Sequence, residues 1–100
     1  MARGYWVVHI EVTDPESYKV YQAFVRPFLA ANAGRFIIRG GQQRVVEGRA
    51  SSRTVLVEFP SYADAVRVYE SADYQRGMQD RLTASVADFV IVEGFEGFEG

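Results

Sequence analysis

The chain has no cysteine and only one histidine among its 100 residues. The absence of cysteine excludes a disulfide framework and thiol chemistry. A single histidine cannot supply the usual ligand set of a zinc site, although carboxylates remain available as ligands. We therefore predict neither a metal site nor a bound cofactor.

A strong excess of positive charge and long apolar runs are also absent. The net charge is −2, and no basic stripe of the kind that nucleic-acid-binding proteins carry is present, so no nucleic-acid partner is predicted. No long apolar run follows a basic region near the N-terminus, which predicts neither a signal peptide nor a membrane span. The expected location is the cytoplasm, with no membrane partner.

The residues that are present form two similar halves. In each half, a strand-forming segment leads through a helix cap and an amphipathic helix to a second strand. Asp14 and Ser61 are the predicted N-caps. This order predicts an α+β, ferredoxin-like split βαβ fold, a four-stranded antiparallel sheet with helices on one face. The predicted strands are residues 5–12, 35–39, 54–59 and 89–93.

Proline, glycine and serine predict local features within these halves. Pro27 is expected to kink or break the first helix just before it, and Gly34 to take the left-handed conformation that closes the helix. Gly40-Gly41 is expected to form a bulge or bend, after which residues 44–47 continue the strand into a hairpin. Ser71 is predicted to cap a short third helix.

A single domain is predicted over residues 1–94, followed by a flexible tail at 95–100, where Phe-Glu-Gly repeats. Within the strands, alternation places two sets of side chains on opposite faces of the sheet. The second set is too apolar to face water and yet carries charge, so it is expected to be covered by a second copy in a homodimer or to form a ligand cleft. The first set is Trp6, Val8, Ile10, Phe36, Ile38, Val55, Val57, Phe59, Val90 and Val92, and the second is Tyr5, Val7, His9, Glu11, Arg35, Ile37, Arg39, Leu56, Glu58, Phe89, Ile91 and Glu93.

Five short motifs occur in order along the chain: Gly4-Tyr5-Trp6-Val7-Val8, Asp14-Pro15-Glu16-Ser17-Tyr18, Gly34-Arg35-Phe36 with Arg39-Gly40-Gly41, Val57-Glu58-Phe59-Pro60-Ser61, and Ser71-Ala72-Asp73-Tyr74-Gln75. Together they resemble domain-of-unknown-function family 1330, from about Gly4 to Gly94. The chain departs from that pattern at Ala72 and Asp73, where the family usually has proline and glutamate. The resemblance implies a homodimer of the dimeric α+β barrel superfamily. That superfamily includes cofactor-independent monooxygenases, lactone isomerases and haem-degrading enzymes, so the resemblance implies no particular activity.

His9 is the side chain best suited to general base catalysis, because its unperturbed pKa lies near neutrality. Glu11 has the same parity and is expected to orient the imidazole. Arg39, on a strand expected to be a neighbour, would bind a carboxylate or enolate oxygen. The alternative interpretation is that His9 and Glu11 form a polar pair at a strand interface.

Aromatic residues are expected to line a pocket between the sheet and the helices. The alternative is that they pack in the core, as aromatics at helical spacing usually do. Tyr74 follows a helix cap, which would point its hydroxyl into a cleft. The candidate ligand-binding residues are Trp6, Glu11, Tyr18, Tyr69 and Tyr74, with Tyr21 as a further member of the aromatic set.

Two functions remain open on the sequence alone. The first is a small homodimeric protein with a small-molecule pocket, acting as a cofactor-independent enzyme of proton transfer or oxygenation on a small aromatic or keto compound. In that case His9 and Arg39 would be the catalytic residues. The second is a non-catalytic ligand-binding or structural dimerisation protein.

Overall fold

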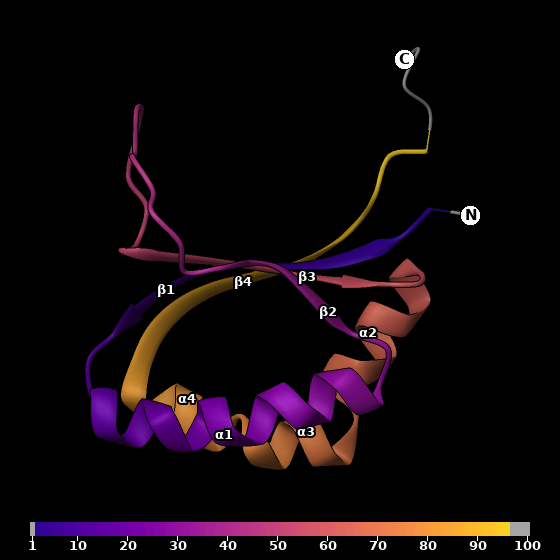
Figure 1. Cartoon of the computed structure of the whole chain (residues 1–100), viewed down its shortest axis with the longest axis horizontal. Helices are drawn as coiled ribbons and strands as arrows, with labels where there is room; N and C mark the ends of the chain where they lie inside the picture. Colours follow the sequence, from indigo (N-terminus) through magenta and orange to yellow (C-terminus); the bar gives the residue numbers. More distant parts are fainter. Residues whose placement is uncertain (1, 97–100) are drawn as a thin grey trace.

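The computed structural model describes residues 2–96, which form one antiparallel sheet with helices packed against one of its faces (Figure 1). The strand order across the sheet is β2-β3-β1-β4. This is the order of the ferredoxin-like fold, so the predicted α+β architecture is confirmed. In chain order the elements are β1 (Gly4–Val12), α1 (Pro15–Ala31), β2 (Arg35–Arg39), β3 (Arg53–Phe59), α2 (Tyr62–Glu70), α3 (Ala72–Gly77), α4 (Gln79–Ala84) and β4 (Ser85–Glu93).

The long helix α1 is unbroken, although Pro27 lies inside it. Asp14 caps its start as predicted, accepting a hydrogen bond from the Ser17 backbone N–H at 3.3 Å. Val25 and Leu29 on either side of the proline are both buried against the core. Their burial holds both segments in one helix, so the break expected before Pro27 does not occur.

The residue that takes the left-handed conformation after α1 is Ala33, with φ of 62°. The expectation that Gly34 would do so is wrong. A Cβ atom at Gly34 would lie 3.0 Å from the Phe59 ring and 3.1 Å from the Leu29 side chain. The absence of a side chain at Gly34 therefore allows α1 and β3 to pack closely at this point.

The second half contains three helices among the described residues, and serine caps position two of them. Ser61 accepts from the Asp64 N–H at 3.1 Å, and Ser71 accepts from the Tyr74 N–H at 3.2 Å. The predicted third helix is therefore present, although it is interrupted at Met78 into α3 and α4. Its cap places Tyr74 in the core, with no exposed surface.

The bend expected at Gly40-Gly41 is present at Gly40, which has φ of 70°. A second irregularity, which was not predicted, lies inside β2. The pairing of β2 with β3 shifts register between Phe36 and Ile38. Beyond the shift, Arg39 pairs with Val55 on the helix-covered face of the sheet, whereas Ile38 is 44% exposed. The predicted faces of Ile38 and Arg39 are therefore wrong, because one extra residue inverts the alternation that follows it.

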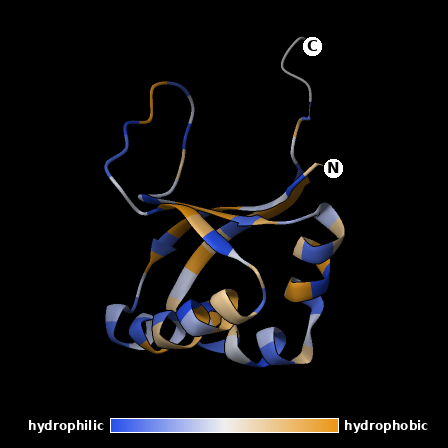
Figure 2. Cartoon of the chain, turned by 45° about the vertical axis from the view of Figure 1, so that its right-hand side comes forward, coloured by the Kyte–Doolittle hydropathy of each residue, from blue (hydrophilic) through white to orange (hydrophobic). Residues whose placement is uncertain are grey.

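Residues 40–52 contain no helix or strand, so the predicted continuation through 44–47 is absent. This segment rises from the sheet on the side away from the helices, and residues 94–96 leave the sheet toward the same side (Figures 1 and 2). Of the predicted tail, Phe95 and Glu96 lie in no regular element. Residues 97–100 lie outside the described part of the chain.

Strand β4 also presents the opposite faces to those predicted. Phe89 lies opposite Val8 and Ile91 opposite Trp6 in the pairing with β1, so Phe89 and Ile91 pack against the core. Val90, between them, is 56% exposed. Apolar residues occupy both faces of β4, so its own sequence does not show which set of side chains faces the core. The pairing with β1 determines it.

The centre of the core is Trp6, which is 1% exposed. Its indole Nε1 donates to the Ala65 carbonyl oxygen at 2.8 Å. The centroids of the Phe59 and Tyr74 rings each lie 4.9 Å from that of the indole, in tilted contacts that stabilise aromatic clusters. One side chain thus ties the sheet to both α2 and α3.

Candidate functional site

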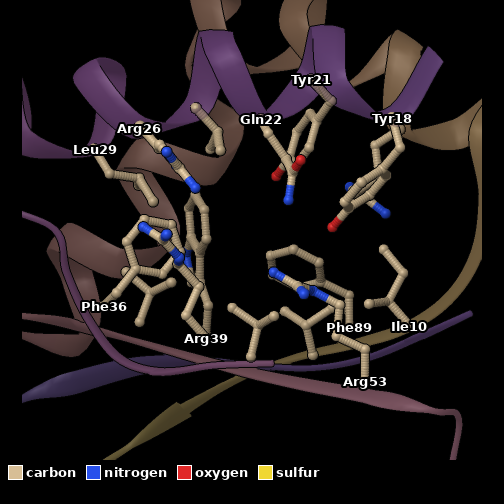
Figure 3. A pocket seen from close by; sticks show the side chains of 16 residues that line it. Ile10, Tyr18, Tyr21, Gln22, Arg26, Leu29, Phe36, Arg39, Arg53 and Phe89 are labelled. Carbon is tan, nitrogen blue, oxygen red and sulfur yellow. The ribbon is translucent and has the colours of Figure 1, made fainter. Parts of the chain in front are cut away.

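A cavity of about 40 Å³ lies between the sheet and α1 (Figure 3). The helix-facing side chains of all four strands form one wall, and α1 forms the opposite wall. Most of the lining is apolar, as is usual for small-molecule sites. The apolar lining includes Val8, Ile10, Val25, Leu29, Phe36 and Phe89.

Tyrosine hydroxyls form one polar part of the site. Tyr18 and Tyr21, one turn apart on α1, both line the cavity. The Tyr21 hydroxyl oxygen lies 2.8 Å from that of Tyr74 in a buried hydrogen bond. Burial raises the pKa of Tyr21 far above its usual range and also raises the pKa of Tyr18 and of Tyr74. All three hydroxyls therefore stay protonated near neutral pH, where they can donate hydrogen bonds and cannot serve as bases.

Guanidinium groups form the other polar part. Arg26 of α1 and Arg39 of β2 reach toward the same end of the cavity from opposite walls (Figure 3). Both side chains are exposed, so they form the mouth of the cavity. Arg53, at the start of β3, and Arg81 of α4 also line it.

The position of Arg53 depends on a glycine. Gly40 has φ of 70°, and a Cβ atom there would collide with the Arg53 guanidinium group. Arg53 therefore packs directly over backbone that carries no side chain. Its Nε is buried and has no hydrogen-bond acceptor.

Arg81 is buried, with only 5% of its surface exposed. Its guanidinium carbon lies 5.3 Å from the centroid of the Phe89 ring and 5.8 Å from that of Tyr21, which are cation–π contacts. One terminal nitrogen contacts the Met78 sulfur at 3.7 Å, a weak acceptor. Its Nε has no acceptor at all, and a buried donor left in this state costs about 1–3 kcal/mol.

Four of the residues predicted from the sequence, Trp6, Tyr18, Tyr21 and Arg39, line the cavity. Tyr69 and Tyr74 lie against the indole, with ring centroids 6.0 and 4.9 Å from that of Trp6. These two rings do not line the cavity, but they pack behind Trp6, which does.

His9 and Glu11 lie on the open face of the sheet, away from the helices. His9 Nδ1 is 3.1 Å from the Thr54 hydroxyl oxygen. Glu11 accepts hydrogen bonds from the Ser52 N–H and hydroxyl at 3.1 and 3.0 Å, so it does not orient the imidazole. Strand β3 separates β1 from β2, and the expectation that Arg39 lies on a strand next to His9 is therefore wrong.

The sequence reasoning missed Gln22, Arg26, Arg53 and Arg81. Arg53 has the same parity as Val55 on β3, and Arg81 follows Met78 by three residues, which is one helical turn. These spacings could have indicated that both arginines point inward. The preference of arginine for the surface argued against that interpretation.

Within residues 2–96, no three histidine, aspartate or glutamate side chains come close enough together to hold a metal ion. In the same range, no helix is both long and apolar enough to cross a membrane.

Several solved structures share this architecture. A protein of unknown function from Rhodopseudomonas palustris, RPA0582, is 14% identical with a TM-score of 0.74 over 96% of this chain and 85% of its own. SnoaB from Streptomyces nogalater, a cofactor-independent oxygenase, is 11% identical with a TM-score of 0.63 over the full length of both chains. A dimeric ferredoxin-like protein of unknown function from Thermobifida fusca is 10% identical with a TM-score of 0.58 over 92% of this chain and 89% of its own. At these identities the similarity establishes the fold alone.

Comparison by sequence gives the family. No curated protein matches the chain at a significant level. Residues 3–95 match the family described as a domain of unknown function, DUF1330. This match covers nearly the whole chain, including the five motifs and the elements that build the cavity, and the chain therefore belongs to the DUF1330 family.

Proposed function

We propose that this protein binds a small organic molecule in the cavity between the sheet and α1, and that it does so as a homodimer. The observation that carries the first part is the composition of the cavity wall. Apolar and aromatic side chains surround a few convergent polar groups, two of which, on Arg53 and Arg81, have buried donors without acceptors. Such a combination is typical of a ligand site and costly in a purely structural core.

The size of the cavity limits how the ligand would enter. A cavity of about 150 Å³ accepts benzene, whereas this one measures about 40 Å³. In this conformation the cavity accommodates one polar group of a ligand. The remainder would lie at the mouth, where Arg26 and Arg39 are exposed and have room to turn outward.

Catalysis is the second candidate function, and the similarity to SnoaB favours it. A cofactor-independent proton transfer or oxygenation of a small aromatic or keto compound needs a substrate that loses a proton. Among residues 2–96, no histidine, aspartate or glutamate lines the cavity, and its tyrosines are held protonated. The geometry therefore supports binding better than catalysis, unless the substrate is already ionised in solution.

The binding proposal is tested with a blocked cavity. Gln22 is half-buried and lines the cavity from α1, whereas the next residue, Ala23, is exposed and does not line it. A panel of neutral and charged small aromatic and keto compounds would be titrated by NMR into the wild type, Gln22→Trp and Ala23→Trp. We expect saturable shifts of α1 amides in the wild type and Ala23→Trp, and none in Gln22→Trp. Absence of binding across the panel, or equal binding by both variants, contradicts the proposal.

The homodimer part rests on the open face of the sheet. Several apolar side chains on this face are exposed, because the helices pack on the other face. They include Ile37, Ile38, Val86, Val90 and Val92. From the spacing and rise of strands, a four-stranded face of this length covers roughly 600 Å². A stable interface buries about 800 Å² on each partner. The segments 40–52 and 94–96 project on this side (Figure 1), and they would supply the remaining contact by flanking a second copy.

Light scattering tests this arrangement through a matched pair of variants. Val90 lies on the open face and is 56% exposed, and Leu82 lies on α4 and is 51% exposed. We expect the wild type and Leu82→Lys to be dimers at micromolar concentration and Val90→Lys to be a monomer. A monomeric wild type, or a dimer that survives Val90→Lys unchanged, contradicts the proposal.

A further inference from the structure

We infer that the ligand of this cavity is a small organic anion, such as an aromatic carboxylate, whose charged group is held by the guanidinium groups at the cavity. This inference rests on the proposed binding function and specifies its ligand class.

The cavity concentrates positive charge in a protein whose net charge is −2. In the part of the chain that the structure describes, four arginines line it and no aspartate or glutamate does. The four are Arg26, Arg39, Arg53 and Arg81. Because guanidinium groups are always protonated at neutral pH, four like charges share one small site. An anion would relieve their mutual repulsion.

The remaining arginines show that this arrangement is not general in the chain. Arg3 and Arg35 both pair with Glu58, and Arg67 and Arg76 pair with acidic residues on their own helices. Within residues 2–96, none of the four cavity arginines forms an ion pair. The two others without such a partner, Arg44 and Arg49, are exposed in the segment 40–52, where water solvates them.

The buried donors give the anion a place to bind. Only 5% of the Arg81 surface is exposed. The Nε atoms of Arg81 and Arg53 are both buried without a hydrogen-bond acceptor. A carboxylate presents about four lone-pair sites and accepts paired hydrogen bonds from guanidinium groups. The Tyr18 hydroxyl, which stays protonated, is a further donor in the lining.

The apolar wall distinguishes an organic anion from an inorganic one. Phe36 is half-buried and lies at the mouth of the cavity, with the Arg39 guanidinium carbon 5.4 Å from its ring centroid (Figure 3). A ring attached to the carboxylate would bury apolar surface against Phe36, which favours binding through loss of apolar surface from water. Inorganic phosphate would interact with the charged groups but would bury no apolar surface.

The test compares three probes by NMR titration: benzoate, its neutral isostere benzamide, and inorganic phosphate. We expect benzoate to bind saturably, one per chain, at least tenfold more tightly than either benzamide or phosphate. Its affinity should fall as NaCl is raised, because salt screens the charges at the mouth. Because the Arg39 side chain is exposed, the Arg39→Gln variant should fold normally, and it should bind benzoate at least fivefold more weakly. The control Arg76→Gln, on the outer surface of α3, should leave that affinity unchanged.

The outcomes separate this inference from the function on which it rests. If benzamide binds as tightly as benzoate, the cavity is a ligand site but the anion inference is wrong. If phosphate binds as tightly as benzoate, the site holds an adventitious ion only, and the inference of an organic anion is again wrong. If Arg53→Gln and Arg39→Gln both keep full benzoate affinity while folded, the arginines do not hold the ligand. If none of these probes and none of the neutral compounds bind, both proposals fail.

Discussion

His9 and Arg39 lie on opposite faces of the same sheet. Arg39 lines the cavity under α1, whereas His9 contacts the Thr54 hydroxyl on the open face. The sheet itself separates the two groups, so they cannot act together on one molecule within a chain. The His9 imidazole and the cationic cavity therefore belong to different surfaces with different expected roles.

The first prediction concerns His9. His9→Ala should leave ligand affinity at the cavity unchanged, because the side chain does not reach it. If the protein is a homodimer through the open face, the same change should alter the dimer dissociation constant, since His9 would lie in the interface. NMR titration with benzoate measures the first effect and sedimentation measures the second. A loss of benzoate affinity in a dimeric His9→Ala variant would contradict the assignment of the two faces.

The second prediction concerns the hydrogen bond between Tyr21 and Tyr74. Each of Tyr21→Phe and Tyr74→Phe should lower the free energy of unfolding by about 1–3 kcal/mol, because each leaves a buried hydroxyl without its partner. The double variant should lose less than the sum, since neither of the two hydroxyls is then left without the other. Urea unfolding at one fixed protein concentration measures all four proteins. Tyr62→Phe, at a 44% exposed position, is the control and should change stability little. Strict additivity would mean that the two hydroxyls do not interact.

The third prediction concerns the glycine beneath Arg53. Gly40 and Gly48 both have positive φ, of 70° and 73°, so Gly→Ala costs about 1–2 kcal/mol of backbone strain at either site. A Cβ atom meets the Arg53 guanidinium group at position 40 and nothing within 4 Å at position 48. Gly40→Ala should therefore displace Arg53 and weaken benzoate binding several-fold. Gly48→Ala should lower the stability of the protein and leave its affinity for benzoate unchanged. Equal benzoate affinities in the two variants would mean that Arg53 does not contribute to the site.

The fourth prediction concerns Glu58 on the open face. Partial burial acts to raise the pKa of its carboxyl group, but hydrogen bonds from Arg35 and the Tyr5 hydroxyl outweigh that effect and lower it. A carboxylate with a lowered pKa in the folded state stabilises the fold at pH values above its unfolded pKa of about 4.3. That stabilisation is lost as the pH falls through the lower, folded value.

Thermal unfolding as a function of pH checks this sign. The wild type should be more stable than Glu58→Gln at pH 7, and the difference should shrink as the pH is lowered below 4. Glu70→Gln, at an exposed position on α2, serves as the control and should follow the wild type. A difference that grows toward acid pH would show that the carboxyl pKa is raised instead.

The sequence predicted the fold because its signals are local. Asp14, Ser61 and Ser71 cap the helices where predicted, since a cap requires only a side-chain oxygen within reach of an N–H two or three residues on. Alternation identified the strands, because period two depends only on neighbouring residues. The order of these elements was then enough to predict the four-stranded sheet.

The candidate site was predicted only in part. Trp6 and Tyr18 were identified because they are aromatic and fall on apolar stripes. Arg53 and Arg81 were not, because an arginine in a sequence is most often at the surface. Their burial depends on Gly40, Phe89 and Tyr21, which lie in other elements of the fold.

By itself, the sequence determined the order, type and capping of the helices and strands, and thereby the topology. Only the tertiary structure decided which face is occupied by the residues of β4 and by those of β2 that follow Phe36. The register shift in β2 turned Arg39 toward the helices, and pairing with β1 turned Phe89 inward and Val90 outward. The physical reason is that alternation within a strand has two equivalent phases, and hydrogen bonding to a strand distant in sequence selects one of them.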